Sequence, residues 1–245
     1  MTDSQDIEIL EHIDSGLYGS VYRAKQQSLD RQVAVKIIKT DLKAADALAH
    51  AAPLARMNHV EIVTVYTMQE IYVPQLDKVV PAIVMEWVEG ETLGKRLSLA
   101  KFTCAEAAAL CHDVLDGVEH LHENGICHLD LHAGNIIVLP NGRAKIIDVD
   151  ANKDISLARL STVSQDGARE SDVDYCRGVV FKILRHSKVP LSLLTDHEPS
   201  LEDADSIQSL RDVVKLISDL VGRSTADTSS AVSVVQVEEL SLIHI

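Results

Sequence analysis

The chain has 245 residues, of which 46% are hydrophobic, 24% are charged and only 3% are aromatic. This length allows one large domain or two small ones, and the composition is that of a globular protein with an aliphatic core. The formal net charge of -14 argues against the concentrated basic surface by which proteins bind nucleic acids or anionic membranes. We therefore expect neither nucleic acid nor a membrane among its partners.

The sequence also indicates where the protein works. No apolar run approaches the roughly 20 residues that span a bilayer, and residues 1–6 are polar and acidic, unlike a signal peptide. The four cysteines, Cys104, Cys111, Cys127 and Cys176, are scattered without C-x-x-C spacing. This pattern indicates reduced, buried thiols rather than a disulfide framework or a zinc site. We expect a cytoplasmic protein.

The first third of the chain reads as a small antiparallel sheet. Apolar and polar residues alternate in short runs separated by turn residues, which is typical of a strand meander. An Ala-rich stretch, residues 41–57, interrupts them and predicts a helix, with Pro53 as a kink or late break. The strand-like runs cover residues 7–10, 20–24, 32–38, 62–68 and 79–86.

Beyond Gly90 the pattern becomes mainly helical. Helices are predicted over residues 104–123, 171–186 and 201–220, and short strands over 136–139 and 144–147. Together these elements predict two lobes within residues 1–239: a β-rich lobe at 1–86, a hinge at 86–90 and a helical lobe at 90–239. Residues 240–245 resemble the translation of a sequencing adapter, so we expect a non-native tail there.

Two motifs in the β-rich part are suited to holding phosphates. Residues 14–21 fit G-x-G-x-x-G-x-V with Asp14 in place of the first glycine, and Val33-Ala34-Val35-Lys36 fits V-A-I-K. Glycine lets a hairpin backbone close over phosphates, and a strand lysine can hold them as a point charge. Taken alone, the first motif is equally a hairpin turn and the second an exposed strand lysine.

Two further motifs lie beyond the predicted helix 104–123. Residues 128–135 fit H-x-D-x-x-x-x-N, with Asp130 and Asn135 as the polar positions. Asp148 ends an apolar strand and falls where D-F-G has its aspartate. Separately these residues could be loop carboxylates and a turn asparagine. The order and spacing of all four motifs argue against that interpretation.

In this order the motifs resemble the protein kinase family, in particular bacterial serine/threonine kinases of the eukaryotic type, from about residue 7 to 239. The resemblance implies a bilobal α+β fold, a small antiparallel β N-lobe with a mainly helical C-lobe, that binds ATP and Mg²⁺ or Mn²⁺. It also implies that the γ-phosphoryl group passes to a hydroxyl of a protein or small molecule. By the same resemblance, Lys36 holds phosphates, Asp130 orients the acceptor, and Asn135 and Asp148 hold the metal.

The resemblance also assigns the adenine pocket and the anchor of the catalytic loop. Residues 83–90 resemble the interlobe hinge, with Met85 as gatekeeper. Residues 173–184 resemble the buried helix that anchors the loop, and either Asp172 or Asp174 could be its anchoring acid. The residues expected to surround the nucleotide are Ser15, Gly16, Gly19, Val21, Ala34, Lys36, Glu86, Val88 and Ile137.

Several positions depart from the family pattern. His50 stands where the family has the C-helix glutamate that pairs with the strand lysine, and Asp46, one turn earlier, could substitute for it. Leu129 replaces the arginine of H-R-D and Asp150 replaces the glycine of D-F-G. With the short segment between Asp148 and the anchoring acid, these changes predict a protein that is not activated by loop phosphorylation.

Three function classes therefore remain open. A serine/threonine protein kinase is favoured by the N-lobe motifs and the hinge. A small-molecule phosphotransferase of the aminoglycoside or choline type is favoured by residues 130–135, in which His132 could contact phosphate or simply pack. A pseudokinase that acts as a binding module is favoured by His50, Leu129 and Asp150.

Overall fold

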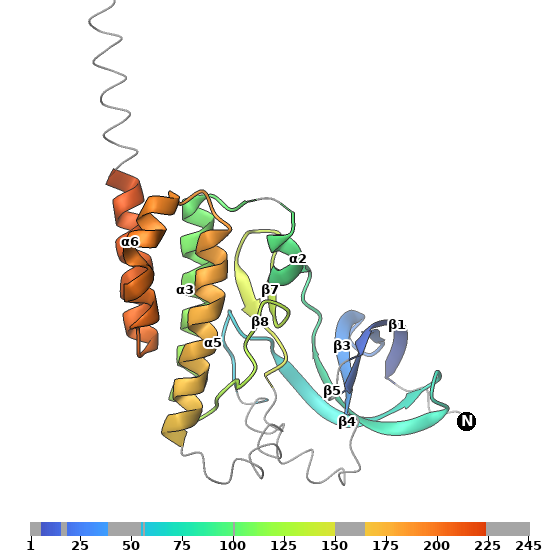
Figure 1. Cartoon of the computed structure of the whole chain (residues 1–245). Coiled ribbons are helices and arrows are strands. Elements are labelled where there is room, and N and C mark those ends of the chain that lie inside the picture. Colours follow the sequence, from blue (N-terminus) through green and yellow to red (C-terminus); the bar gives the residue numbers. More distant parts are fainter. Residues whose placement is uncertain are drawn as a thin grey trace, which may run out of the picture.

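The computed structural model describes residues 6–15, 19–38, 55, 57–99, 101–149 and 165–223. Within these ranges an antiparallel sheet forms the N-terminal part and a mainly helical region follows it, which confirms the predicted fold class (Figure 1). The helical region also contains a sheet of three strands. No helix in the described ranges has both the length and the apolarity to cross a membrane.

The N-terminal sheet has five strands in the order β1-β2-β3-β5-β4. The strands are β1 (Ile7–Ser15), β2 (Gly19–Gln26), β3 (Arg31–Ile38), β4 (Val65–Val73) and β5 (Lys78–Glu86). The strand predicted over 62–68 begins later, because Ile62 and Val63 pair instead with the C-terminal part of the chain. Ile62 bridges to Ile146, and the Val63 N–H donates to the Ile146 carbonyl at 2.9 Å.

The period-two alternation of the strands divides their apolar residues between two cores. Val33 and Val35 of β3 and Val84 of β5 belong to a cluster made only of residues from the five-stranded sheet. Ala34 and Met85 face the other way and join a larger cluster that includes the helices. We call these the sheet core and the main core. Among the described residues, the buried members of the sheet core are Ile7, Tyr22, Ala24, Val33, Val35, Ile37, Ile71, Val73, Ala82 and Val84.

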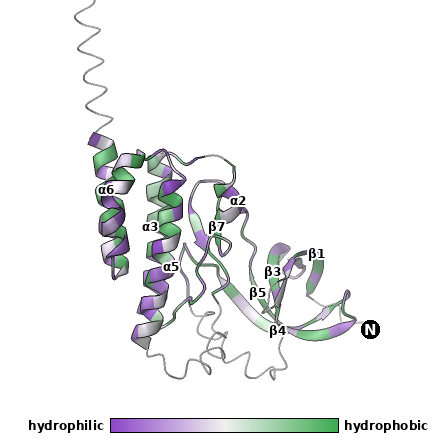
Figure 2. Cartoon of the chain, viewed as in Figure 1, coloured by the Kyte–Doolittle hydropathy of each residue, from purple (hydrophilic) through white to green (hydrophobic). Residues whose placement is uncertain are grey.

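The helical region is built around α3 (Cys104–Glu123) and α5 (Gln165–Arg185), which pack side by side (Figure 1). A capping box starts α3: the Thr103 hydroxyl accepts from the Glu106 N–H, and the Glu106 carboxylate accepts from the Thr103 N–H. Hydrophobic and hydrophilic residues are interspersed along α3 (Figure 2), and its apolar ones are largely buried. The other elements are β6 (Glu91–Thr92), α2 (Leu93–Leu97), β7 (Ile136–Val138), β8 (Ala144–Ile146), α6 (Leu191–Glu202) and a helix at 207–223.

Helix 104–123 is confirmed with its predicted bounds, whereas two other helix predictions need correction. The single helix predicted over 201–220 is wrong: α6 ends at Glu202 and a new helix follows. The break has a local cause, because the Ser206 hydroxyl accepts from the Ser209 N–H at 3.1 Å, as an N-cap does. The helix predicted over 171–186 begins earlier, at Gln165. The helix predicted at 41–57 lies outside the described residues, apart from 55 and 57.

Candidate active site

Lys36, from the five-stranded sheet, and Asp148, from the chain after β8, form an ion pair. Lys36 lies in the middle of β3, opposite Val21 on β2, and its side chain is largely buried. Asp148 follows β8 and has a positive φ of 60°, and its carboxylate contacts the β3 lysine. The structure thus brings together two residues separated by 112 positions.

Asp130 and Asn135 belong to one closed loop beside Asp148. The Asn135 side-chain amide donates to the Asp130 carbonyl at 3.0 Å, and the Ile147 N–H donates to the Asn135 carbonyl at 2.9 Å. These bonds close the loop between Asp130 and Asn135 and fix it to the residue preceding Asp148. An amide oxygen and a carboxylate oxygen are the kinds of ligand that Mg²⁺ takes, so Asn135 and Asp148 fit the metal that the resemblance implies.

The anchor of this loop is Asp172, which settles the choice between the two aspartates. Its fully buried carboxylate accepts from the His128 N–H at 2.7 Å, the Leu129 N–H at 2.6 Å and His122 Nε2 at 2.9 Å. Leu129 is held with a φ of +59°, a left-handed conformation that costs a non-glycine residue about 1–2 kcal/mol. Asp174 is instead exposed and pairs with Arg177.

The hinge is tied to both the chain before β4 and the strand that leads to Asp148. The Lys145 ammonium donates to both Glu86 carboxylate oxygens, at 2.8 and 2.7 Å, and is almost completely buried. Glu86 also exchanges two hydrogen bonds with Thr64, one from its own N–H at 2.9 Å and one to its carboxylate at 3.2 Å. A buried cation thus fixes the residue whose backbone is expected to meet adenine.

The expected phosphate loop is described only at its two ends. Ser15 on β1 lies opposite Ser20 on β2, with their hydroxyls 2.9 Å apart. Gly16 is outside the described residues. Gly19 is needed for close packing, because an added Cβ would lie 2.3 Å from the Ile37 carbonyl oxygen. This packing constraint is separate from the expected access to the phosphates, which stays a prediction.

The residues expected to surround adenine come from the two sheets of the structure and from the hinge. Ala34 is buried opposite Met85, and Ile137 lies on β7 under the hinge. Gly90 allows that approach, because an added Cβ would lie 2.4 Å from the Val138 carbonyl oxygen and 2.6 Å from the Ile137 side chain. Val88, the other expected adenine contact, is half-buried and packs against the main core. Behind Met85, a cavity of about 20 Å³ reaches Lys36 and Asp148.

A family model described as "Protein kinase domain" matches residues 7–167, which is more than half of the chain. This chain belongs to the protein kinase domain family. The match covers both the β3 lysine and the H-x-D-x-x-x-x-N loop, so the family membership rests on the same residues that the structure brings together.

Several curated relatives of this kinase domain are serine/threonine-protein kinases by name. "Probable serine/threonine-protein kinase SCO3848" of Streptomyces coelicolor is 34% identical over 139 residues, 54% of this chain and 20% of the relative. "Serine/threonine-protein kinase PksC" of the same organism is 32% identical over 152 residues, which are 58% of this chain and 27% of the relative. "Serine/threonine-protein kinase pkn2" of Myxococcus xanthus is 30% identical over 167 residues, which are 65% of this chain and 19% of the relative. The chain thus spans about a fifth to a quarter of the length of these relatives.

Two charged clusters of the kinase domain are not apparent from its sequence. One is the Lys145–Glu86 pair; its only local signal is a lysine inside the apolar run 144–147. In the other, the buried carboxylates of Glu61 and Asp113 share Arg143, with contacts of 2.8 Å each. The hydrogen bond to Asp113 raises the pKa of Arg143 above its ordinary value.

Four other predicted positions either lie outside the described residues or take part in a local contact. Asp46, His50 and Asp150 lie outside the described residues, so the question of the C-helix acid stays a prediction. His132 is exposed, and its Nδ1 accepts from the Gly134 N–H at 3.0 Å, so it stabilises its own turn.

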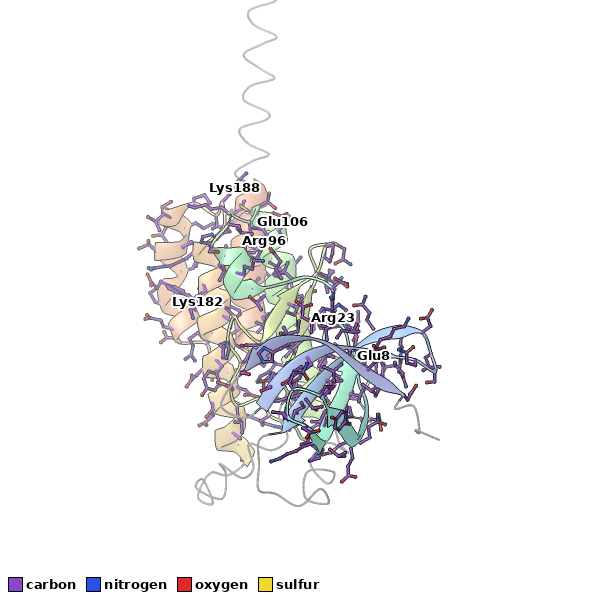
Figure 3. The ribbon with its side chains drawn as sticks, turned by 90° about the vertical axis from the view of Figure 1, so that its right-hand side faces the viewer. Glu8, Arg23, Arg96, Glu106, Lys182 and Lys188 are labelled. Atoms are coloured by element: carbon purple, nitrogen blue, oxygen red, sulfur yellow. The ribbon has the colours of Figure 1, made fainter. Side chains whose placement is uncertain are left out.

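A cavity of about 650 Å³ in the helical region is separate from the Lys36–Asp148 pair. It lies between α2, α3 and the β7–β8 turn, with Phe102 and Leu110 among its apolar walls. Arg96 and Glu106 border it and lie close together at the end of the molecule remote from the five-stranded sheet (Figure 3). Their charges already have partners: Arg96 stacks on Phe102, and the Thr103 N–H is the main cause of the lowered pKa of Glu106.

Proposed function

We propose that this kinase domain is an ATP- and Mg²⁺-dependent phosphotransferase, and specifically a serine/threonine protein kinase. The observation that carries the proposal is the Lys36–Asp148 contact beside the loop that holds Asp130 and Asn135. A cation from one lobe and oxygen ligands from the other then converge where a triphosphate and its metal would lie. The names of the relatives support serine/threonine acceptors.

Each residue has a role that follows from its position. Lys36 would bind phosphate oxygens, and Asn135 and Asp148 would hold Mg²⁺, which neutralises charge on the phosphates when bound. Asp130 would orient the acceptor hydroxyl and accept its proton. Phosphoryl transfer requires little covalent chemistry from the protein, so positioning and charge neutralisation account for most of the catalysis.

A small-molecule acceptor is the second candidate. His132 is exposed on the catalytic loop, and only its Nδ1 is used within the turn. This leaves an imidazole edge at the acceptor side of the site. The two candidates are separated by where the phosphate is recovered: on serine or threonine of an added protein such as casein, or on an added aminoglycoside or choline.

The test of the proposed function is transfer of labelled γ-phosphate from Mg²⁺-ATP. Replacing Asp130 with Asn should lower the rate by about 100-fold or more, because a positioned general base contributes about 10²–10⁴. Asp174→Asn is the matched control, since Asp174 is an exposed carboxylate of α5 and should leave the rate unchanged. An Asp130→Asn variant as active as the parent would refute the role of Asp130. A parent without transfer to any acceptor would favour the pseudokinase.

A second prediction concerns the hinge. Lys145→Met leaves the Glu86 carboxylate without its buried cation and loosens the backbone that would meet adenine. We expect KM for ATP to rise about tenfold, equivalent to about 1.4 kcal/mol, with a smaller change in kcat. Lys145→Arg should recover most of the loss. Lys95→Met, which removes an exposed lysine paired with Glu91, is the control. An unchanged KM in a folded Lys145→Met protein would contradict the prediction.

A further inference from the structure

His122, Cys127 and Asp172 form a cluster of potential metal ligands behind the catalytic loop. The His122 ring nitrogens, the Cys127 sulfur and the Asp172 carboxylate offer one ligand atom each, and these atoms lie within 4.8 Å of one another. His122 is in the last turn of α3, Cys127 is in the connection that follows, and Asp172 is on α5. The cluster therefore joins two packed helices at the point where the catalytic loop begins.

The donor set selects for one class of cation. A thiolate, an imidazole and a carboxylate suit Zn²⁺, whose sites often have three protein ligands and one water. Mg²⁺ prefers oxygen ligands alone and would not take a thiolate. His122 Nε2 and Asp172 Oδ2 are already 2.9 Å apart, so two of the ligands need little rearrangement to share an ion.

The surroundings give a cation a route to the cluster. His122 and Cys127 are partly exposed, whereas Asp172 is fully buried. His122 also lines a cavity of about 460 Å³, in which acidic side chains outnumber basic ones and raise the local concentration of cations. The basic side chain there, Arg169, donates to the His122 carbonyl at 2.7 Å. The acidic residues are Glu119, Glu123, Asp166, Glu170 and Asp205.

We propose that His122, Cys127 and Asp172 form a binding site for a zinc-class divalent cation, separate from the proposed Mg²⁺ site at Asn135 and Asp148. Binding would release the thiol proton of Cys127 to solvent. His122 would give up its Nε2–H hydrogen bond to Asp172, and its ring proton would move from Nε2 to Nδ1, so that neutral His122 binds the ion through Nε2. Asp172 retains its bonds to the catalytic loop through the Leu129 and His128 N–H groups. The ion would fix the end of α3 to α5. Cysteine spacing alone does not indicate this set, because the third ligand, Asp172, lies 50 positions beyond His122 in the sequence.

The experiment that tests the site does not depend on phosphotransfer. Binding of ZnCl₂ to the parent chain is measured by calorimetry in the presence of millimolar Mg²⁺. In parallel, iodoacetamide labelling is followed by mass spectrometry with and without Zn²⁺. We expect one tightly bound equivalent, a higher Tm and loss of Cys127 labelling. Cys104 is also partly exposed but lies at the opposite end of α3, so its labelling should not change.

Two variants complete the test. Cys127→Ala should weaken Zn²⁺ binding by about 100-fold or more, because it removes the thiolate ligand. Cys104→Ala, the matched control, should bind like the parent. If Cys127→Ala fails to fold, protection of Cys127 from iodoacetamide by Zn²⁺ in the parent chain tests the site without a variant. No binding at 100-fold excess Zn²⁺, unchanged labelling of Cys127, or full affinity in folded Cys127→Ala would each overturn the proposal.

Discussion

Replacing Lys36 with Met, or Asp148 with Asn, should remove most of the thermal stabilisation that Mg²⁺-ATP gives the parent protein. A ligand bound only by the folded state stabilises it by about 2.7 kcal/mol at a concentration of 100 times its Kd. Lys36 is a largely buried cation, and Asp148 is the carboxylate it contacts from the other lobe. Without either, the triphosphate or its metal loses a charged partner. The shift is measured as Tm with and without millimolar Mg²⁺-ATP.

The Tm of each variant without nucleotide is measured first, because both substitutions also break the Lys36–Asp148 ion pair. Lys25→Met is the matched control: Lys25 is on β2, is partly exposed and pairs with Asp30. It should keep the full nucleotide shift. If Lys36→Met and Asp148→Asn also kept it, the nucleotide would be bound elsewhere, and the proposed function would lose its main support.

Replacing Asp172 with Ala should produce the largest loss of folding stability among the single changes considered. The substitution leaves three donors, the His128 and Leu129 N–H groups and His122 Nε2, without their buried acceptor. Each buried unsatisfied polar group costs about 1–3 kcal/mol, so we expect a loss of about 3–5 kcal/mol in the free energy of unfolding. Denaturation by urea measures it. Phosphotransfer should fall as well, because Leu129 is held in a strained conformation next to Asp130.

Asp174→Ala provides the comparison within the same helix. Asp174 is exposed, and its partner among the described residues is Arg177 of the same helix, so its loss should change stability by no more than about 0.5 kcal/mol. Equal costs for the two substitutions would show that the Asp172 carboxylate is not the anchor of the catalytic loop.

Local patterns in the sequence predicted much of this fold. The alternation in residues 32–38 is that of a strand with one face in each core, and β3 has that arrangement. The Thr103–Glu106 capping box and the apolar face behind it explain why helix 104–123 was predicted with its observed bounds. The candidate site was predictable for another reason: its residues are few, and the order of their motifs is specific.

Partners that are distant in the sequence could not be predicted in the same way. Asp172 and Asp174 are two positions apart on a helix, so they point in nearly opposite directions, and only the packing of α5 shows which one meets the catalytic loop. From the sequence alone Lys145 would be assigned to the surface, because its buried contact with Glu86 depends on how β8 packs beside the hinge. The break between α6 and the next helix depends on a serine cap in a segment that otherwise favours helix.

The existence of two cores has a consequence for the cooperativity of unfolding. The sheet core is made of residues from β1–β5 alone, whereas the main core extends from the cleft face of that sheet through α3 and α5. Lys36 comes from the sheet and Asp148 from the region below it. A nucleotide held by both would therefore link two units that could otherwise open separately, and it would make their unfolding a more concerted event.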